Sequence, residues 1–197
     1  HVIRADEWLS SVPLHLELFK TLGFKTPKYA HTASIMKEDD GKKRKISKRK
    51  DPEAAVSYYH EEGIPSQAVY EYLLNIANSN FEGWRKANPD KDISEFKFEL
   101  GKMSVSGAVF DMVKLLDVSK NVISKYTKER LYDEVLTWAK RYDSELEEML
   151  NDKEYSLNVF GIERGNTKPR KDIAKWSDVK ESIISVSYTH LTLPTIA

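Results

Sequence analysis

Apolar and polar positions near the start of the chain predict two strands with a helix between them. Residues 1–5 (HVIRA) have the pattern of a short buried strand end. Pro13 suits the first turn of a helix, and side chains at helical spacing then follow as far as Gly23: His15, Leu18, Phe19 and Leu22. Residues 29–36 (YAHTASIM) predict a second strand that runs into a charged loop. This order is typical of the last βαβ portion of a Rossmann-like sheet, whose ligands bind at the carboxyl ends of the strands.

Signals for helix starts and stops dominate the rest of the chain. Asp51 as N-cap, Pro52 in the first turn and the acid Glu53 predict a helix through about Glu62, with Gly63 as its end. Three further helices are predicted by apolar side chains at helical spacing. The first stripe consists of Val69, Tyr72, Leu73 and Ile76, and the second of Val109, Met112, Val113 and Leu116. The third, in a helix over about 128–150, consists of Leu131, Val135, Trp138, Tyr142 and Met149.

Two stretches lack such stripes. Residues 78–91, with Gly83 and Pro89, and residues 161–171 are interpreted as polar connectors. The predicted fold class is therefore α/β and then mostly α. The last residues, 185–197 (SVSYTHLTLPTIA), carry no charge and follow a densely charged stretch, so we interpret them as non-native, with a native strand as the alternative.

Composition narrows the class of protein. With 40% hydrophobic and 31% charged residues the chain is typical of soluble globular proteins. Its formal net charge of zero argues against a protein that coats nucleic acid, because only local patches could attract a polyanion. The absence of cysteine excludes disulfides, thiolate zinc sites and a cysteine nucleophile. The sequence contains no apolar run of about 18 residues and no signal peptide. We therefore expect a cytoplasmic location and no association with a membrane.

One local patch is strongly basic. Residues 42–50 (KKRKISKRK) hold seven positive charges around Ile46 and Ser47. Lysine acts as a mobile point charge and arginine as a rigid fork, and both suit phosphate oxygens. A solvated basic loop or a nucleic-acid-binding tail is the alternative, because most such runs have these roles.

The upstream residues decide between these interpretations. Residues 1–13 (HVIRADEWLSSVP), followed about thirty residues later by the basic run and by Asp51-Pro52, resemble the second half of the catalytic domain of bacterial glutamyl-tRNA synthetases. These are class I aminoacyl-tRNA synthetases. Residues 45–49 (KISKR) are similar to the "KMSKS" signature of that class, and the resemblance covers about residues 1–184.

The resemblance implies roles for individual side chains. It implies a catalytic role for Lys45, Ser47 and Lys48, which stabilise the ATP phosphates. The residues implied to bind ATP are Ile35 and Met36, through backbone groups beside the adenine, together with Lys45, Lys48 and Arg49. The implied substrate-binding residues are Arg4, Glu7 and Trp8, and no metal-ligating residue is expected. A salt bridge to Asp6 or Glu7 is the alternative role for Arg4, and plain packing is the alternative for Trp8.

The implied activity is that of a glutamate–tRNA ligase. Such an enzyme activates glutamate with ATP and Mg²⁺ as substrate complex, without a permanently bound cofactor, and transfers the glutamyl group to the 3′ end of tRNA. The implied partners are tRNA-Glu, with tRNA-Gln left open, glutamate and ATP; a monomer is expected, with the oligomeric state left open. A non-catalytic RNA-binding module and a glutaminyl-tRNA synthetase relative are the rival interpretations. Residues 168–171 beside Trp176 are a further candidate for RNA contact, with a solvated face as the alternative.

The resemblance also implies a division into domains. Residues 1–62 would be the end of the Rossmann-like catalytic domain with its lysine loop, residues 63–126 a stem-contact helical region, and residues 127–184 the start of a helical anticodon-binding domain. The chain begins at His1 inside a motif and contains no "HIGH" signature, the second ATP motif of the class. We therefore expect a fragment of the enzyme that is inactive in isolation.

Overall fold

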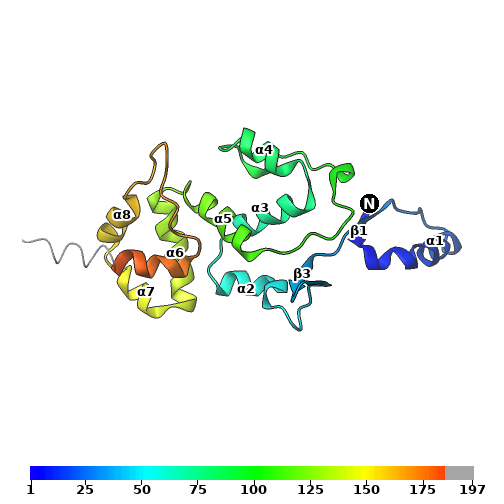
Figure 1. Cartoon of the computed structure of the whole chain (residues 1–197), viewed down its shortest axis with the longest axis horizontal. Coiled ribbons are helices and arrows are strands. Elements are labelled where there is room, and N and C mark those ends of the chain that lie inside the picture. Colours follow the sequence, from blue (N-terminus) through cyan, green and yellow to red (C-terminus); the bar gives the residue numbers. More distant parts are fainter. Residues whose placement is uncertain (185–197) are drawn as a thin grey trace, which may run out of the picture. The chain divides into compact units, whose positions relative to one another are not determined.

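The computed structural model describes residues 1–184, so the segment interpreted as non-native lies outside the described residues (Figure 1). The described residues form two compact units that alternate along the chain. Unit 1 consists of His1–Lys50 and Leu73–Asp111, and unit 2 consists of Asp51–Tyr72 and the described residues from Met112 on. None of the described helices is long and apolar enough to cross a membrane.

Unit 1 begins with the predicted strand, helix and strand. Strand β1 (Val2–Ala5) pairs in parallel with β2 (Tyr29–Thr32), and Arg4 lies opposite His31. Between them come a 3-10 helix, η1 (Asp6–Ser11), and helix α1 (Val12–Thr21), which has a proline in its first turn. Gly23, with φ of 68°, follows the helix end. The sequence prediction of a βαβ order is confirmed for this part of the chain.

The strand expected over residues 29–36 is confirmed only as far as Thr32, and the loop expected after it is wrong. After β2 ends at Thr32, a separate strand β3 (Met36–Asp39) pairs antiparallel with β4 (Lys42–Lys45). Asp40 and Gly41 connect them with φ of 49° and 75°, the left-handed conformation that a two-residue hairpin turn requires. The first half of the basic run is thus a strand, and an Asp-Gly turn signal that we overlooked explains it.

The expected polar connector over residues 78–91 contains a helix. Helix α3 (Ser66–Ala77) is followed by α4 (Phe81–Ala87) and by the 3-10 helices η3 (Ile93–Glu95) and η4 (Leu100–Lys102). The ring of Phe81 is buried and packs edge-on against Phe96, with 5.0 Å between the ring centroids. Aromatic side chains that are far apart in sequence therefore pack together and hold residues 81–96 in place. They have no helical spacing, so the pattern of apolar positions does not predict this packing.

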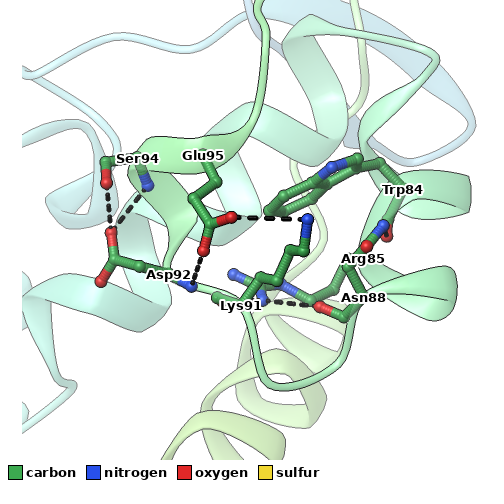
Figure 2. Close-up of polar contacts among 7 residues, drawn as sticks. All are labelled: Trp84, Arg85, Asn88, Lys91, Asp92, Ser94 and Glu95. Atoms are coloured by element: carbon green, nitrogen blue, oxygen red, sulfur yellow. Dashed lines mark hydrogen bonds and ion pairs between the residues drawn. The ribbon is translucent and has the colours of Figure 1, made fainter.

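Figure 2 shows the polar contacts that close the corner between α4 and η3. Arg85 donates from Nη1 to the carbonyl oxygen of Lys91 at 2.7 Å. Asp92 accepts from the backbone N–H of Ser94 at 2.8 Å, while the backbone N–H of Asp92 donates to Glu95 at 3.3 Å, which completes a capping box. The hydrogen bonds from Ser94 lower the pKa of Asp92 below its usual value. The corner is a defined structure rather than a loose connector.

Unit 2 contains the remaining helices, and two of the predicted helices are broken in it. The first, expected to run from Asp51 to Glu62, is divided at the extended residue Ala55 into η2 (Pro52–Ala54) and α2 (Val56–Glu61). Asp51 is the N-cap of η2, but its side chain makes no capping bond.

The second break divides the helix expected over 128–150. Helix α6 (Lys128–Tyr142) ends at Asp143, whose φ of −149° is not helical. The side chain of Asp143 then accepts from the backbone N–H of Leu146 at 3.0 Å and so starts α7 (Ser144–Met149). Helix α8 (Lys153–Gly161) and the 3-10 helix η5 (Trp176–Asp178) pack on α6, with the predicted connector of 161–171 between them (Figure 1).

The expected inward face of α5 (Met112–Ile123) is also wrong. Val113 is 79% exposed, and the side chains that α5 buries are Leu115, Ser119, Val122 and Ile123. On α3, Tyr72 is buried as predicted, but Leu73 is exposed and Ala68, outside the predicted stripe, is buried. The 3.6-residue period is confirmed in both helices, while the buried face is rotated from the predicted one, completely in α5 and partly in α3.

Candidate functional site

Every side chain that the resemblance implies for catalysis, substrate binding or ATP binding lies in unit 1. Arg4 comes from β1, Glu7 and Trp8 from η1, and Ile35 and Met36 from the entrance to β3. Lys45 is the last residue of β4, and Ser47, Lys48 and Arg49 lie in the turn that follows it.

Arg4 is held by histidines and aromatic rings. Its Nε donates to Nε2 of His31 at 3.3 Å, and its Nη1 lies 2.9 Å from Nδ1 of His15. The guanidinium stands over the ring of Tyr29 at 4.8 Å from the centroid and over that of Trp8 at 5.8 Å. These contacts fix the plane of the guanidinium although β1 is short.

One nitrogen of Arg4 has no acceptor among residues 1–184. Within the part of the chain that the structure describes, Nη2 is buried and makes no hydrogen bond. A buried donor without a partner costs about 1–3 kcal/mol, and more for a charged group. The arrangement is therefore suited to a ligand with acceptor oxygens, and a carboxylate matches the fork of a guanidinium.

The acids beside Arg4 have other partners. Glu7, considered above as a salt-bridge partner of Arg4, makes an ion pair with Lys45. Asp6 accepts from the hydroxyl of Ser34 at 2.9 Å. The Glu7–Lys45 pair is about half exposed, so it contributes about 0–1 kcal/mol at most. Its importance is geometric, because it brings a proposed substrate-binding residue and a proposed catalytic lysine together.

The signature residues after β4 form a tight turn. The backbone N–H of Lys50 donates to the carbonyl oxygen of Ser47 at 2.9 Å, and the backbone N–H of Arg49 donates to the hydroxyl of Ser47 at 3.4 Å. The side chains of Lys48 and Arg49 are exposed. The hydroxyl of Ser47 thus orders a turn that presents cations to solvent.

The turn is attached to the segment at Ile35 and Met36. The backbone N–H of Ile46 donates to the carbonyl oxygen of Ile35 at 3.0 Å. Met36 is paired on its other side: its N–H donates to Ala108 at 2.8 Å, and its carbonyl oxygen accepts from Phe110 at 2.7 Å. The sequence analysis did not identify residues 107–110 as neighbours of this site.

Residues 168–171 provide no aromatic platform for RNA. Trp176 is buried and lies against Tyr126, with 6.3 Å between the ring centroids, so it presents no free face to a base. Lys171 donates to Asn121 at 2.6 Å, and Arg170 pairs with Asp172 at 2.9 Å. The burial of Trp176 favours the alternative for residues 168–171, a solvated face.

In chemical terms the site combines a partly unsatisfied guanidinium with a turn that carries lysines and an arginine. Such groups bind and polarise anionic oxygens, and they need no covalent step. No group of three or more histidine, cysteine or acidic side chains among residues 1–184 is arranged to hold a metal ion. The guanidinium and the lysines themselves suit anionic oxygens, such as those of a carboxylate or a phosphate.

Comparison with known proteins gives a consistent result. The family described as "tRNA synthetases class I (E and Q), catalytic domain" matches residues 1–117. A relative from Clostridium perfringens (strain 13 / Type A), described as a glutamate–tRNA ligase, is 58% identical over 184 residues. That match covers 93% of this chain and 34% of the relative. A relative with the same description from Sorangium cellulosum is 48% identical, with 93% of this chain and 35% of the relative covered. The chain thus spans about a third of the length of these curated relatives.

Solved structures share the fold. The crystal structure of a glutamate tRNA ligase from Elizabethkingia meningosepticum, in complex with its amino acid, matches 92% of this chain and 36% of that chain. The TM-score is 0.65 at 21% sequence identity. The glutamate-tRNA synthetase of Elizabethkingia anophelis gives a TM-score of 0.64 at 20% identity, with 92% of this chain and 37% of that chain covered. At this level of identity the likeness concerns the fold alone.

Proposed function

Because the chain belongs to the class I tRNA synthetases for glutamate and glutamine, we propose that it is part of a glutamate–tRNA ligase. The complete enzyme would activate glutamate with ATP, as its Mg²⁺ complex, and then transfer the glutamyl group to the 3′ end of tRNA. Relatives described as glutamate–tRNA ligases at up to 58% identity support this reading over a glutaminyl enzyme. Its expected location is the cytoplasm.

The proposal is carried by Nη2 of Arg4, which is buried and has no partner among residues 1–184, together with the Glu7–Lys45 pair in the same unit. In the proposal, Arg4 binds a carboxylate of glutamate, while Glu7 and Trp8 line the pocket of the amino acid. Lys45, Lys48 and Arg49 bind the phosphates, and the backbone at Ile35 and Met36 borders the adenine. Lys48 offsets the charge that develops when the glutamate carboxylate attacks the α-phosphate, which displaces pyrophosphate.

We also propose a division of the chain into three parts. Residues 1–62 belong to the end of a Rossmann-like catalytic domain, residues 63–126 to a stem-contact region and residues 127–184 to the start of a helical anticodon-binding domain. The parallel pairing of β1 and β2 around α1 supports the first assignment. A tRNA for glutamate is the proposed nucleic-acid partner.

A test should separate chemistry from simple binding of anions. In the complete ligase that contains these residues, Lys48→Ala should lower kcat for glutamate-dependent ATP/pyrophosphate exchange about a hundredfold to a thousandfold, the usual loss when one transition-state donor is removed. The affinity for glutamate should stay within about twofold, because Lys48 lies in the phosphate turn and not beside Arg4.

The matched control is Lys43→Ala, which removes the same charge from an exposed side chain of β4 outside the signature turn. It should leave the exchange rate nearly unchanged. If Lys48→Ala and Lys43→Ala have equal effects, only the net charge of the run matters. A loss confined to tRNA affinity would favour the rival interpretation, a non-catalytic RNA-binding module.

The isolated 197-residue chain should form no glutamyl-adenylate. In the class that it resembles, ATP is held between the lysine turn and a "HIGH" signature, and no such sequence occurs in these residues. Without that second side the triphosphate is not oriented for attack, and orientation supplies several kcal/mol of the rate acceleration, about 7–11 in favourable cases. Pyrophosphate exchange by the purified chain would contradict the assignment of its site.

A further inference from the structure

Gly107 lies closer to the entrance of β3 than any side chain would allow. A Cβ atom placed on Gly107 would lie 2.5 Å from the carbonyl oxygen of Ser34 and 2.6 Å from Cγ of Met36. A backbone oxygen cannot yield as the end of a flexible side chain can, so any other residue would push the two segments apart. The φ angle of Gly107 is not in the left-handed region, so close approach is the reason for glycine here.

This approach allows residues 108–110 to act as an additional strand. Met36 and Val109 form a parallel bridge, with hydrogen bonds from Met36 to Ala108 and from Phe110 to Met36. On its other side Met36 pairs with Lys45 of β4. Met36 is therefore held between two neighbours, one of which leads directly into the lysine turn.

The position of the lysine turn, Ser47 to Arg49, also depends on the start of β3. The turn follows Ile46, whose N–H bonds to the carbonyl oxygen of Ile35, one residue before Met36. A displacement of β3 at Ser34–Met36 would move the hairpin and with it the turn from Ser47 to Arg49. Arg4 itself would be affected less, because β1 is held by its own pairing with β2; its links to the hairpin run through Asp6, which accepts from Ser34, and Glu7, which pairs with Lys45.

We propose that Gly107 is a positioning residue for the lysine turn. Its missing side chain lets residues 107–110 pair with Met36, and that pairing sets where Lys45 and Lys48 stand relative to the bound nucleotide. The inference rests on the proposed function, because it assigns the turn to ATP. It predicts that a larger residue at 107 weakens the use of ATP more than the use of glutamate.

The test uses Gly107→Ala and Gly107→Val in the complete ligase, with Gly101→Ala and Gly101→Val as matched controls. Gly101 lies six residues upstream in η4, and a Cβ there would meet nothing within 4 Å. Gly107→Val should lower kcat/KM for ATP about tenfold to a hundredfold, the scale expected when catalytic groups are displaced by about 1 Å. Gly107→Ala should have a smaller effect in the same direction, and both Gly101 variants should resemble the wild type.

A second measurement reports on the pairing itself. Hydrogen exchange of peptides that span Met36 and Phe110 should speed up in the Gly107 variants and not in the Gly101 variants. The KM for glutamate should change several-fold less than the KM for ATP, since Arg4 is held by the pairing of β1 with β2 and not by β3. If Gly107→Val does not fold, Gly107→Ala decides the result.

The outcomes distinguish the inference from its premise. Normal ATP kinetics and normal exchange at Met36 in the Gly107 variants would overturn the positioning role, and so would equal losses for ATP and glutamate. A wild-type ligase without glutamate-dependent exchange would overturn the proposed function instead. In that case the hydrogen exchange of Met36 and Phe110 would still test whether Gly107 permits the pairing.

Discussion

At the scale of single residues, the main feature is the guanidinium of Arg4, which is held in one orientation and has one donor available for a ligand. The side chain is oriented by His15 and His31 and stacked on Tyr29, yet one of its nitrogens is buried without an acceptor among the described residues. A fully paired arginine would contribute to stability alone. An arginine with one unsatisfied, fixed donor loses less entropy when a carboxylate arrives, which favours tight and specific binding.

Arg4→Lys should therefore raise KM for glutamate in the complete ligase about tenfold or more, since one charge-assisted hydrogen bond is worth about 1.5–3 kcal/mol. Lysine keeps the positive charge but loses the planar fork and the stacking on Tyr29. The KM for ATP should stay nearly constant. Pyrophosphate exchange measured against each substrate in turn gives both constants.

A suitable control for this change is Arg44→Lys. Arg44 lies on β4, where it pairs with Asp39 at the surface, and it has no proposed contact with glutamate. If Arg4→Lys raises both Michaelis constants together, Arg4 has a structural role rather than a role in substrate binding.

At the scale of elements, the end of α2 depends on a glycine that meets two tryptophans. Gly63 has φ of 75°, and its carbonyl oxygen accepts from the backbone N–H of Trp176 at 2.8 Å. The indole N–H of Trp138 donates to the carbonyl oxygen of His60 at 2.8 Å. Lys175 donates to Glu62 at 3.0 Å, and this hydrogen bond raises the pKa of Lys175. The helix end is thereby joined to α6 and η5.

Gly63→Ala should destabilise unit 2 through two separate effects. The left-handed backbone costs a non-glycine residue about 1–2 kcal/mol. The new Cβ would also lie 3.0 Å from the backbone nitrogen of Trp176 and 3.1 Å from Cε2 of Trp138, and such overpacking typically costs about 1–3 kcal/mol. Urea denaturation followed by tryptophan fluorescence measures the sum.

Gly165→Ala separates these effects. Gly165 has φ of 84°, but a Cβ there would meet nothing within 4 Å, so only the backbone cost should appear. Equal losses of stability in the two variants would show that the tryptophans accommodate the methyl group and that the contact has no energetic weight.

At the scale of the whole molecule, buried apolar side chains are distributed unevenly. All the buried hydrophobic residues of the described chain belong to unit 2, except Phe81. In unit 1, α1 buries none of its residues, and Leu14 and Leu18 are 70% and 52% exposed. Apolar burial is the main favourable term in folding, so the two units should differ in stability.

Hydrogen exchange of the isolated chain should reveal this difference. Amides of α5 and α6, which bury Leu115, Ile123, Leu131 and Val135, should exchange at least about a hundredfold more slowly than those of α1. Resolved amide exchange by NMR gives the comparison within one sample. Equal protection of α1 and α6 would mean that unit 1 gains its stability from contacts other than apolar burial.

Local sequence signals determine where several helices and turns of this protein begin and end. Pro13, Gly23 and Gly63 mark helix boundaries, because each acts through neighbours within a few residues. The signature around Lys45 and Lys48 is equally local, and the phosphate-binding role that it predicts is a proposal. The Asp40-Gly41 turn and the capping box of Asp92 and Glu95 were equally local and readable. The local sequence therefore contains the information that specifies both features.

Only the tertiary structure decided which surfaces meet. On α5, Leu115 is buried and Val113 is exposed because of packing partners that are distant in sequence. The helical spacing of apolar residues predicts that a helix forms, but it does not determine which face of the helix is buried. The same holds for the Glu7–Lys45 pair and for the approach of Gly107 to Ser34. These contacts join residues 38 and 73 positions apart, and the free energy that selects them comes from packing and burial of the folded chain rather than from any local preference.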